Sequence, residues 1–324
     1  MKMKQIVPIL ISITILLAFG LWNTESDKGS IRIGIIQTAS HPALDAARVS
    51  FIAELEKRLG KPVTWVSQNG EGSISQIATI AKSYAADSRM HAVYAIGTPA
   101  VQMVNRMAPK KPLLYAAISD PKALGLGPMA CGTSDRLDVV AQATLIRELL
   151  PQARRVAILL NPAEHNSNIQ VTAMEKALSA VEIFTTRVGI HSQSDITAAV
   201  ASASRQADLL LVPADNLLVS AMPLLAKTAL RFKIPLIVSD TPSVTRGALL
   251  AKGVDYKDCG RCTAELAQLL LSGEKTPSEI GTIDPENKLL LVNHNTQKSL
   301  GVELPLSLQS QAIHVNTEEG LSCR

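Results

Sequence analysis

The stretch IRIGIIQTASHPALDAARVSFIAELEKRLG, from Ile31 to Gly60, decides the fold class. Its first seven residues, Ile31–Gln37, form a short apolar run with the composition of a β-strand. The segment from Pro42 to Gly60 has the usual start and stop signals of a helix, with proline at its start and glycine at its end. A short strand followed by a helix of this length is the repeating unit of parallel sheets, so the stretch predicts an α/β fold.

Strand-like runs and helical patterns alternate in this way along the rest of the chain. The first series continues through PVTWVSQ, SISQIATIAKSYAAD, HAVYAIG and TPAVQMVNRMA to PLLYAAIS. A second series of helices and strands begins with a helix predicted over 134–153. It continues through RVAILLN, ADLLLVP and PLIVSD to a last strand and helix in KLLLVNHNTQKSLGVELP. Repeated units of this kind predict parallel sheets with helices on both faces.

A chain of 324 residues favours two such domains over one. Because no low-complexity linker divides the halves, we expect several short crossings between them rather than one. We predict two doubly wound parallel-sheet lobes with a ligand cleft between them. Lobe 1 is expected to comprise 31–134 and 242–273, and lobe 2 to comprise 135–241 and 274–324.

The N-terminus, residues 1–30, reads as a signal peptide or an N-terminal anchor. The basic start MKMK precedes an apolar run from Ile6 to Trp22, and polar residues follow at once. This order is typical of a Sec-type export signal, with small residues at Ala18 and Gly20 for cleavage after Gly20. The apolar run has the minimum length of a spanning helix, so an uncleaved anchor in the inner membrane is the competing interpretation. Either way, we expect the folded part of the protein in the periplasm.

The composition limits the classes of partner. The chain is 47% hydrophobic but only 3% aromatic, so aliphatic side chains must fill its cores. The net charge is +4, and no basic stripe or run of like charges stands out. Nothing therefore indicates a nucleic-acid partner, and we expect contact with the membrane only through the N-terminal segment or a transporter.

The four cysteines include a C-x-x-C that opens a predicted helix, Cys259 to Cys262, with Cys131 and Cys323 far away in sequence. A helix N-terminus lowers the pKa of a thiol, so a thiol oxidoreductase is one hypothesis. The motif lies late in a large chain, however, and not after the first strand of a small thioredoxin-like domain. A disulfide formed passively after export, or two unlinked thiols on a helix, is the alternative. The scattered histidines and cysteines predict no metal site.

Small polar residues gather where the predicted strands end. In open α/β sheets, ligands bind beyond the carboxyl ends of the strands. Backbone N–H groups at helix starts can hold a carboxylate, and carboxylates from other strands can hold an ammonium. Such a site suits a zwitterion such as an amino acid. Each of these residues could also be only a helix N-cap or turn former, but clusters at corresponding strand ends in both halves favour a shared cleft.

Several segments carry a specific resemblance. They are AIGTPAVQ, AAISDP, CGTSD, LLPQARRVAILLNPAEHNS, PADNLLVSA, IPLIVSDTPSVTRGALLAKGVDYKDCGR and NTQKSLGVELP. In these the chain resembles the ABC-transporter substrate-binding family that includes tryptophan- and tyrosine-uptake proteins, which has the type 1 periplasmic-binding fold. The resemblance covers nearly everything after residue 30. It implies two lobes that close over a small ligand, with a membrane permease and its ATPase as partners.

The resemblance also implies which residues bind the ligand. Thr98, Ser119 and Asp120 would line the first lobe, Asn166, Ser167, Asp215 and Asn216 the second, and Asp255 would return to the first; Asp240 replaces the acidic residue usual after its strand. Hydroxyl groups among them can donate to a carboxylate. The aspartates are candidate acceptors for an ammonium, and Asp255 is the leading one.

Two departures bear on the ligand's side chain. The family often has two aromatic residues after the aspartate of its GVD motif, whereas here Tyr256 is followed by Lys257. The scarcity of aromatic residues also leaves few stacking partners for an indole or a phenol. An aromatic amino acid is therefore only the default expectation for the ligand.

The sequence contains no motif of an enzyme. There is no G-x-G-x-x-G after the first strand, no phosphate-binding P-loop and no G-x-S-x-G. The acids Asp135 and Asp138 are expected on a helix at i,i+3 spacing, on a solvated face or as partners of the helix dipole. We predict a monomeric exported solute-binding protein of an ABC importer, without catalysis or cofactor. A sensor of the same fold that feeds a membrane receptor is the first alternative, and a thiol oxidoreductase is the second.

Overall fold

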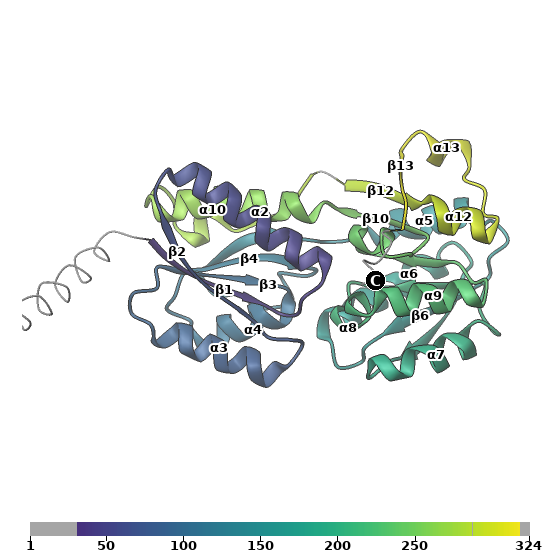
Figure 1. Cartoon of the computed structure of the whole chain (residues 1–324), viewed down its shortest axis with the longest axis horizontal. Helices are drawn as coiled ribbons and strands as arrows, with labels where there is room; N and C mark the ends of the chain where they lie inside the picture. Colours follow the sequence, from purple (N-terminus) through teal and green to yellow (C-terminus); the bar gives the residue numbers. More distant parts are fainter. Residues whose placement is uncertain (1–30, 287, 318–324) are drawn as a thin grey trace, which may run out of the picture.

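The computed structural model describes residues 31–286 and 288–317, and these form two α/β lobes side by side along the long axis of the molecule (Figure 1). The predictions for residues 1–30 and for Cys323 concern residues outside the described ranges. Among the described residues, no helix combines the length and apolar character needed to cross a membrane.

The first lobe is built on a six-stranded, fully parallel sheet. Its strand order is β11 (Thr282–Ile283), β5 (Ala130–Ser134), β4 (Leu113–Ile118), β3 (Ala92–Ile96), β1 (Ile31–Gln37) and β2 (Val63–Asn69). The helices on one face are α2 (Pro42–Leu59) and α10 (Tyr256–Leu271), with α11 (Pro277–Ile280) nearby; those on the other are α3 (Ile74–Ala86) and α4 (Thr98–Met107) (Figure 1). β3 and β4 are buried throughout, as expected for central strands covered on both faces.

The second lobe has a seven-stranded sheet in which one pair of strands is antiparallel. Its strand order is β13 (Ala312–Val315), β12 (Lys288–Asn293), β10 (Leu250–Val254), β9 (Leu236–Val238), β8 (Leu209–Val212), β6 (Arg155–Leu160) and β7 (Phe184–Gly189). One face carries α5 (Val139–Leu149), α6 (His165–Ser179), α12 (His294–Leu300) and α13 (Leu306–Gln309). The other carries α7 (Ile196–Ala203), α8 (Asn216–Ser220) and α9 (Met222–Arg231), with the 3-10 helices η1 (Gln193–Asp195) and η2 (Thr241–Val244) in its loops. Only β10 and β12 run antiparallel, a departure from the predicted all-parallel sheet.

The chain crosses between the sheets three times: at 135–138 after β5, at 255 after β10, and after β11, which ends at Ile283. Several short crossings were expected, but two of the predicted lobe boundaries differ from the sheet membership. β10, expected in lobe 1, pairs with β9 and β12 of the second sheet. β11, expected in lobe 2, pairs with β5 of the first sheet. An apolar pattern identifies a strand but not its partner, because pairing depends on residues far away in the sequence.

The contact of α2 with α10 explains the glycine of the C-x-x-C segment. A Cβ atom added at Gly260 would lie 2.2 Å from the carbonyl oxygen of Ala47 and 2.1 Å from Oγ of Ser50. Only glycine allows the two helices to approach this closely. Cys259 faces the same interior and is fully buried, so the segment serves helix packing.

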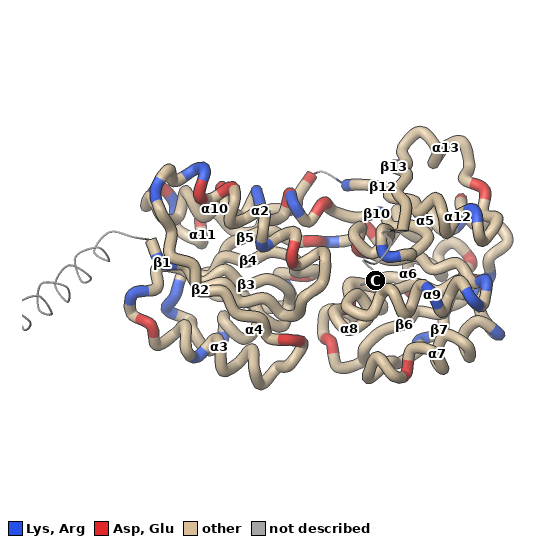
Figure 2. Tube along the Cα trace, viewed as in Figure 1, with Lys and Arg blue, Asp and Glu red and all other residues tan. Residues whose placement is uncertain are grey.

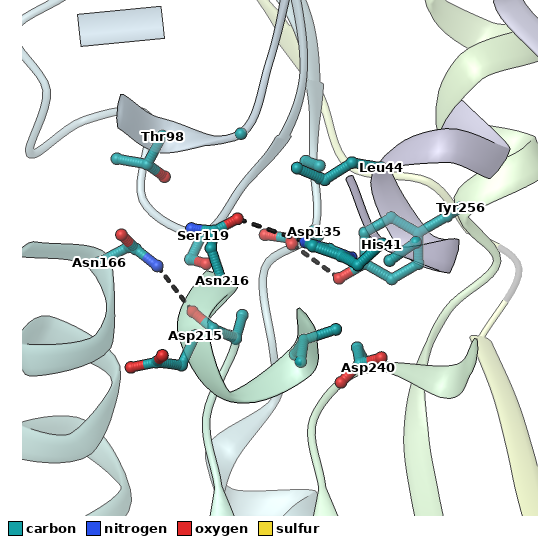
Figure 3. A pocket seen from close by; sticks show the side chains of 15 residues that line it. His41, Leu44, Thr98, Ser119, Asp135, Asn166, Asp215, Asn216, Asp240 and Tyr256 are labelled. Atoms are coloured by element: carbon teal, nitrogen blue, oxygen red, sulfur yellow. Dashed lines mark hydrogen bonds between the residues drawn. The ribbon is translucent and has the colours of Figure 1, made fainter. Parts of the chain in front are cut away.

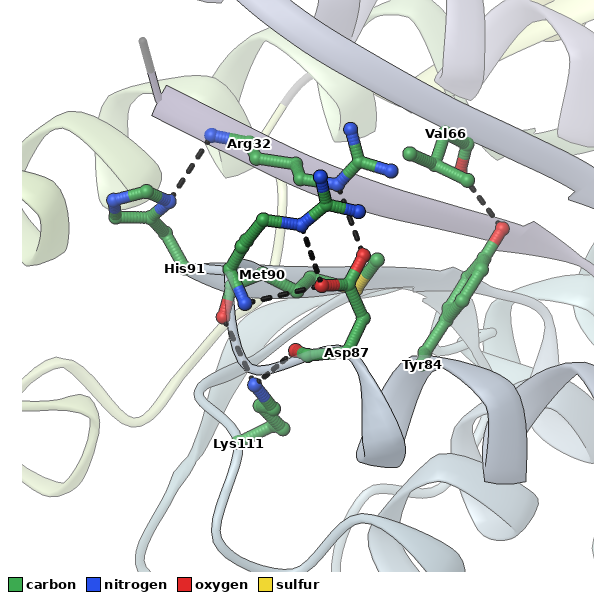
Figure 4. A network of polar contacts seen from close by, with 8 residues as sticks. Arg32, Val66, Tyr84, Asp87, Met90, His91 and Lys111 are labelled. Carbon is green, nitrogen blue, oxygen red and sulfur yellow. Dashed lines mark hydrogen bonds and ion pairs between the residues drawn. The ribbon is translucent and has the colours of Figure 1, made fainter. Parts of the chain in front are cut away.

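A polar network holds together the end of the first lobe at which the parallel strands begin (Figure 4). The carboxylate of Asp87 accepts hydrogen bonds from the side chains of Arg32 and Arg89, at 3.0 Å and 3.3 Å. The ammonium of Lys111 donates to the backbone oxygens of Asp87 and Met90. These bonds tie the starts of β1, β3 and β4 together and leave the opposite strand ends to form the site.

Charged residues of both signs are interspersed over the two lobes (Figure 2). Acidic and basic residues both lie along the boundary between the lobes.

Candidate functional site

A pocket lies between the lobes at the carboxyl ends of the parallel strands (Figure 3). Its cavity volume is about 20 Å³, the room that about one water molecule needs. It is lined by His41, Ala43, Leu44, Gly97, Thr98, Ala117, Ser119, Asp135, Asn166, Ala214, Asp215, Asn216, Val219, Asp240 and Tyr256. A wider cleft adjoins it and shares Asn166 and Asn216 with it.

Helix starts and strand ends place these side chains. Thr98 is the first residue of α4, and it follows Gly97, whose φ of 88° is one that residues with a Cβ rarely adopt. Ser119 directly follows β4, and Asn166 lies in the first turn of α6. Because all the strands involved are parallel within their sheets, their polar ends meet at the edges that face each other.

Two buried carboxylates give the pocket its chemistry. Asp240 is 1% exposed; its Oδ2 accepts from the backbone N–H of Ser243 at 3.0 Å, while its Oδ1 has no partner in the described part of the chain. Burial raises the pKa of Asp240 to about 6. Oδ2 of Asp135 accepts from the Tyr256 hydroxyl at 2.9 Å, and its Oδ1 is likewise buried without a partner there. Burial raises the pKa of Asp135 as well.

Asp215 has a different role although it also lines the pocket. Its Oδ2 accepts from the backbone N–H of Asn161 at 2.6 Å and from the Ser167 hydroxyl at 2.8 Å. Its Oδ1 caps α8 by accepting from the N–H of Leu218 at 3.1 Å. Both oxygens are therefore engaged in shaping the pocket wall.

Glu164 supports the same wall from outside the pocket. Its carboxylate accepts from the backbone and side-chain N–H groups of Asn216, at 3.0 Å and 2.7 Å, and from the N–H of Leu217 at 3.1 Å. Burial, reinforced by the charge of Asp215, raises the pKa of Glu164 to about 7. Glu164 thereby fixes the start of α8 and the orientation of the Asn216 amide.

The pocket also offers hydroxyl donors. The Thr98 side chain makes no hydrogen bond within the described residues, and it stands at the N-terminus of the ten-residue helix α4. Ser119 also lines the pocket, at the end of β4. Hydroxyls and helix N-terminal N–H groups are suited to binding a carboxylate.

Six of the nine predicted site residues line this pocket together: Thr98, Ser119, Asn166, Asp215, Asn216 and Asp240. The other three lie outside it. Ser167 is buried behind Asp215, to which it donates. Asp120 accepts from the N–H of Ala123 in the turn after β4, and Asp255 caps α10 by accepting from the N–H of Lys257 at 2.9 Å. The structure thus gives Asp255 the cap role that the sequence left as the alternative, and places it outside this pocket.

Asp135 corrects the sequence-based interpretation. The helix expected over 134–153 begins only at Val139, with Asp138 as its N-cap. Asp135 therefore lies in the crossing between the lobes and turns toward Tyr256 instead of facing solvent. Its position directly after the strand β5 could have identified Asp135 as a candidate site residue. The alternation of strands and helices did not reveal β5, because the segment ACGTS is short and polar.

His41 and Leu44 were also not predicted. His41 precedes α2 in an extended conformation, and Nε2 of its ring lies 3.4 Å from Oδ1 of Asn216, so it joins the two lobes across the pocket. Burial lowers the pKa of His41 to about 4, which keeps the ring neutral at neutral pH. The histidine in TASHPALD follows a strand end, as the predicted residues do, and that position was the available signal.

Comparison with known proteins places this geometry in a family. Residues 32–316 match the family described as ABC transporter substrate binding protein. The chain belongs to this family. A tyrosine-binding protein of Clostridioides difficile (strain R20291) is 32% identical over 290 residues, 86% of this chain and 83% of that protein.

Two solved structures are similar to the chain. The ABC domain in complex with L-Trp from Streptococcus pneumonia has a TM-score of 0.82 at 26% identity, over 87% of this chain and 99% of that one. The ligand-free, open structure of a substrate binding protein with adhesive properties from Clostridium difficile has a TM-score of 0.68 at 31% identity, over 89% of this chain and 100% of that one. The type 1 periplasmic-binding fold and the predicted family are confirmed.

The family is one of solute-binding proteins, which confirms that the chain is not an enzyme. The cysteines agree with this. Cys131, Cys259 and Cys262 are free, and burial raises the pKa of the Cys259 thiol well above its usual range. A reactive cysteine needs the opposite, a lowered pKa and exposure.

Proposed function

We propose that this ABC transporter substrate-binding protein takes up an amino acid, with an aromatic side chain as the first expectation, in the pocket between its lobes. The observation that carries the proposal is the pair of buried carboxylates, Asp135 and Asp240, each with an open oxygen toward one pocket. An α-ammonium between them would replace two unsatisfied acceptors with charge-assisted hydrogen bonds.

The opposite charge of the ligand would meet hydroxyl donors of the first lobe. Thr98 at the start of α4 and Ser119 after β4 can donate to an α-carboxylate, and the helix N-terminus adds a favourable dipole. Carboxylates and hydroxyls in one pocket complement a zwitterion better than a sugar, which has no charge to balance two buried acids.

Lobe closure is the proposed mode of binding. His41, at the start of α2 in the first lobe, meets Asn216 of α8 in the second lobe across the pocket. The TM-score against the L-Trp complex exceeds that against the open, ligand-free structure although the latter has the higher identity. This supports a closed arrangement of the lobes here. A ligand that touches both lobes stabilises the closed state by its preferential affinity for that state, and a permease with its ATPase would receive the closed form.

Mass spectrometry of the small molecule that copurifies with the protein tests the proposal. We expect an amino acid, released on denaturation at close to one equivalent per chain. A copurified sugar, nucleotide or peptide would contradict the proposal.

Export is part of the proposed function. The apolar run before residue 31 would direct the chain out of the cytoplasm, with a mature N-terminus near residue 21. N-terminal sequencing of the exported protein checks this, and intact Met1 in the membrane fraction would favour an anchor instead. Loss of amino-acid uptake on deletion would favour an importer subunit, whereas unchanged uptake would favour the sensor alternative.

A further inference from the structure

The pocket is smaller than the ligand proposed for it. Its cavity of about 20 Å³ has room for about one water molecule. An amino acid has many more heavy atoms than a water molecule, so it cannot occupy the pocket while the lining side chains stand as described. The adjoining cleft is larger, about 580 Å³, but neither Asp135 nor Asp240 is among the residues that line it. Binding at the two acids therefore requires part of the pocket wall to move.

The contact between His41 and Asn216 is a part of the wall that joins the two lobes (Figure 3). Nε2 of His41, in the first lobe, lies 3.4 Å from Oδ1 of Asn216, in the second. Asn216 lines both the pocket and the wider cleft, so it stands at the boundary between them. Separation of this pair would enlarge the pocket toward the cleft.

Glu164 sets the direction of this hydrogen bond. Its carboxylate accepts from Nδ2 of Asn216 at 2.7 Å, and an ionised carboxylate can only accept. The Asn216 amide therefore turns its Oδ1 toward His41, whose Nε2 must carry the proton and donate it. Burial keeps the His41 ring neutral by lowering its pKa to about 4, so the contact is a neutral hydrogen bond. Glu164 acts here as a positioning residue, since it also holds the backbone N–H groups of Asn216 and Leu217.

The same side of the pocket carries a second contact between the lobes. Helix α2, which His41 precedes, contacts η2 of the second lobe. Asp240 is the N-cap of η2. Because α2 and η2 belong to different lobes, a motion that separates His41 from Asn216 also moves the start of α2 away from the surroundings of Asp240. The pocket thus gains room next to one of its two acids.

We infer that the hydrogen bond between His41 and Asn216 is a latch that closes the lobes without a ligand, and that an amino acid must break it to bind. The inference rests on the proposed function, because the latch and the ligand would compete for the same pocket. Only the chains whose latch is open are then competent to bind, and the apparent affinity falls in proportion to their fraction. Removal of the latch should tighten binding.

Calorimetric titration with L-tryptophan and L-tyrosine tests the competition. The titrations are run at pH 8, above the pKa of Glu164, which is about 7. His41→Ala should bind the preferred amino acid about 3- to 10-fold more tightly than the wild type does. His41→Gln can still donate to Asn216 and should stay within about twofold of the wild type, as should His314→Ala, which removes an exposed histidine on β13. Unchanged or weaker binding by His41→Ala would overturn the inference.

Small-angle X-ray scattering distinguishes a latch from a pocket that the substitution merely enlarges. Without amino acid at pH 8, His41→Ala and Asn216→Ala should each have a larger radius of gyration than the wild type and His41→Gln, because their lobes are no longer held together. Unchanged radii in both alanine variants would overturn the inference even if affinity rises. If neither amino acid binds to the wild type, the proposed function loses its support, and the scattering still decides whether the latch exists.

Discussion

At the scale of single residues, the proposed activity depends on carboxylates that the fold leaves incompletely satisfied. Asp240 uses one oxygen to cap η2 and turns the other to the pocket, at the cost of a raised pKa. Asp215 and Asp255 have the same residue type at comparable strand ends, but their hydrogen bonds serve helix caps. Under the proposed function, an aspartate that binds the ligand differs from a structural one in having a carboxylate oxygen without a partner among the described residues.

Asp240→Asn should therefore weaken amino-acid binding by at least about tenfold, because a charge-assisted hydrogen bond contributes roughly 1.5–3 kcal/mol. Calorimetric titration checks this, with Asp255→Asn as the matched control. Asp255 lies outside the pocket and asparagine also caps helices well, so the control should bind within about threefold of wild type. The reverse ranking of the two variants would restore Asp255 as the ammonium partner.

The same substitution should stabilise the unliganded protein at pH 8. The pKa of Asp240 is raised in the folded state, from 3.8 to about 6, so the folded state holds its proton more tightly than the unfolded state does. Its contribution to the free energy of unfolding thus falls as the pH rises from about 4 to about 6 and stays low above that. Removing the charge should recover up to about 3 kcal/mol at pH 8, measurable by urea denaturation at pH 4 and pH 8. A stability loss at pH 8 would contradict this account.

Ligand binding should depend on pH in the opposite direction. An ammonium prefers ionised Asp240, which must lose its proton below pH 6, so affinity should be constant from pH 8 to pH 7 and fall by up to about tenfold per unit below 6. Asp135 acts in the same sense, since burial raises its pKa too. Titrations at pH 5, 6 and 8 check the trend. Tighter binding at pH 5 than at pH 8 would be incompatible with an ammonium held by these acids.

At the scale of elements, the alternation of strands and helices was predictable because each apolar run is local in sequence. β5 and β11 were missed, since the first is short and polar and the second has only two residues. The start of α5 was predicted too early, so Asp135 was wrongly placed on this helix. Residues at strand ends could be listed as candidates from the sequence, but their selection depends on burial and on hydrogen bonds between distant segments, such as that from Tyr256 to Asp135.

The packing of α10 on α2 makes a prediction at this scale. Gly260→Ala should destabilise the protein by about 1–3 kcal/mol or more, because the added Cβ meets backbone atoms of α2 that cannot move aside as a side-chain tip would. Gly127→Ala is the control, as its nearest neighbour would lie at 3.6 Å, an ordinary contact. Denaturant unfolding of both variants checks this. Equal stabilities would mean that the two helices pack less closely than described.

At the scale of the whole molecule, two sheets joined by three crossings bring the pocket together from residues of both lobes. The lobe to which each crossing segment belongs was the part of the domain organisation that the sequence did not reveal, because β10 and β11 join sheets through strands remote in sequence. The central claim is that this interlobe pocket recognises both charges of an amino acid at once. A ligand that carries only the ammonium or only the carboxylate should then bind much more weakly than the amino acid.

Calorimetric titration with an amino acid and its two truncated analogues tests this claim most directly. The ligands are L-tryptophan, tryptamine, which lacks the carboxylate, and indole-3-propionate, which lacks the ammonium, with the corresponding tyrosine series in parallel. We expect one equivalent of at least one of the two amino acids to bind, and both of its analogues to bind at least about 100-fold more weakly, since each leaves charged or polar groups of the pocket unpaired. Binding of indole-3-propionate as tight as that of L-tryptophan, or no binding in either series, would contradict the account.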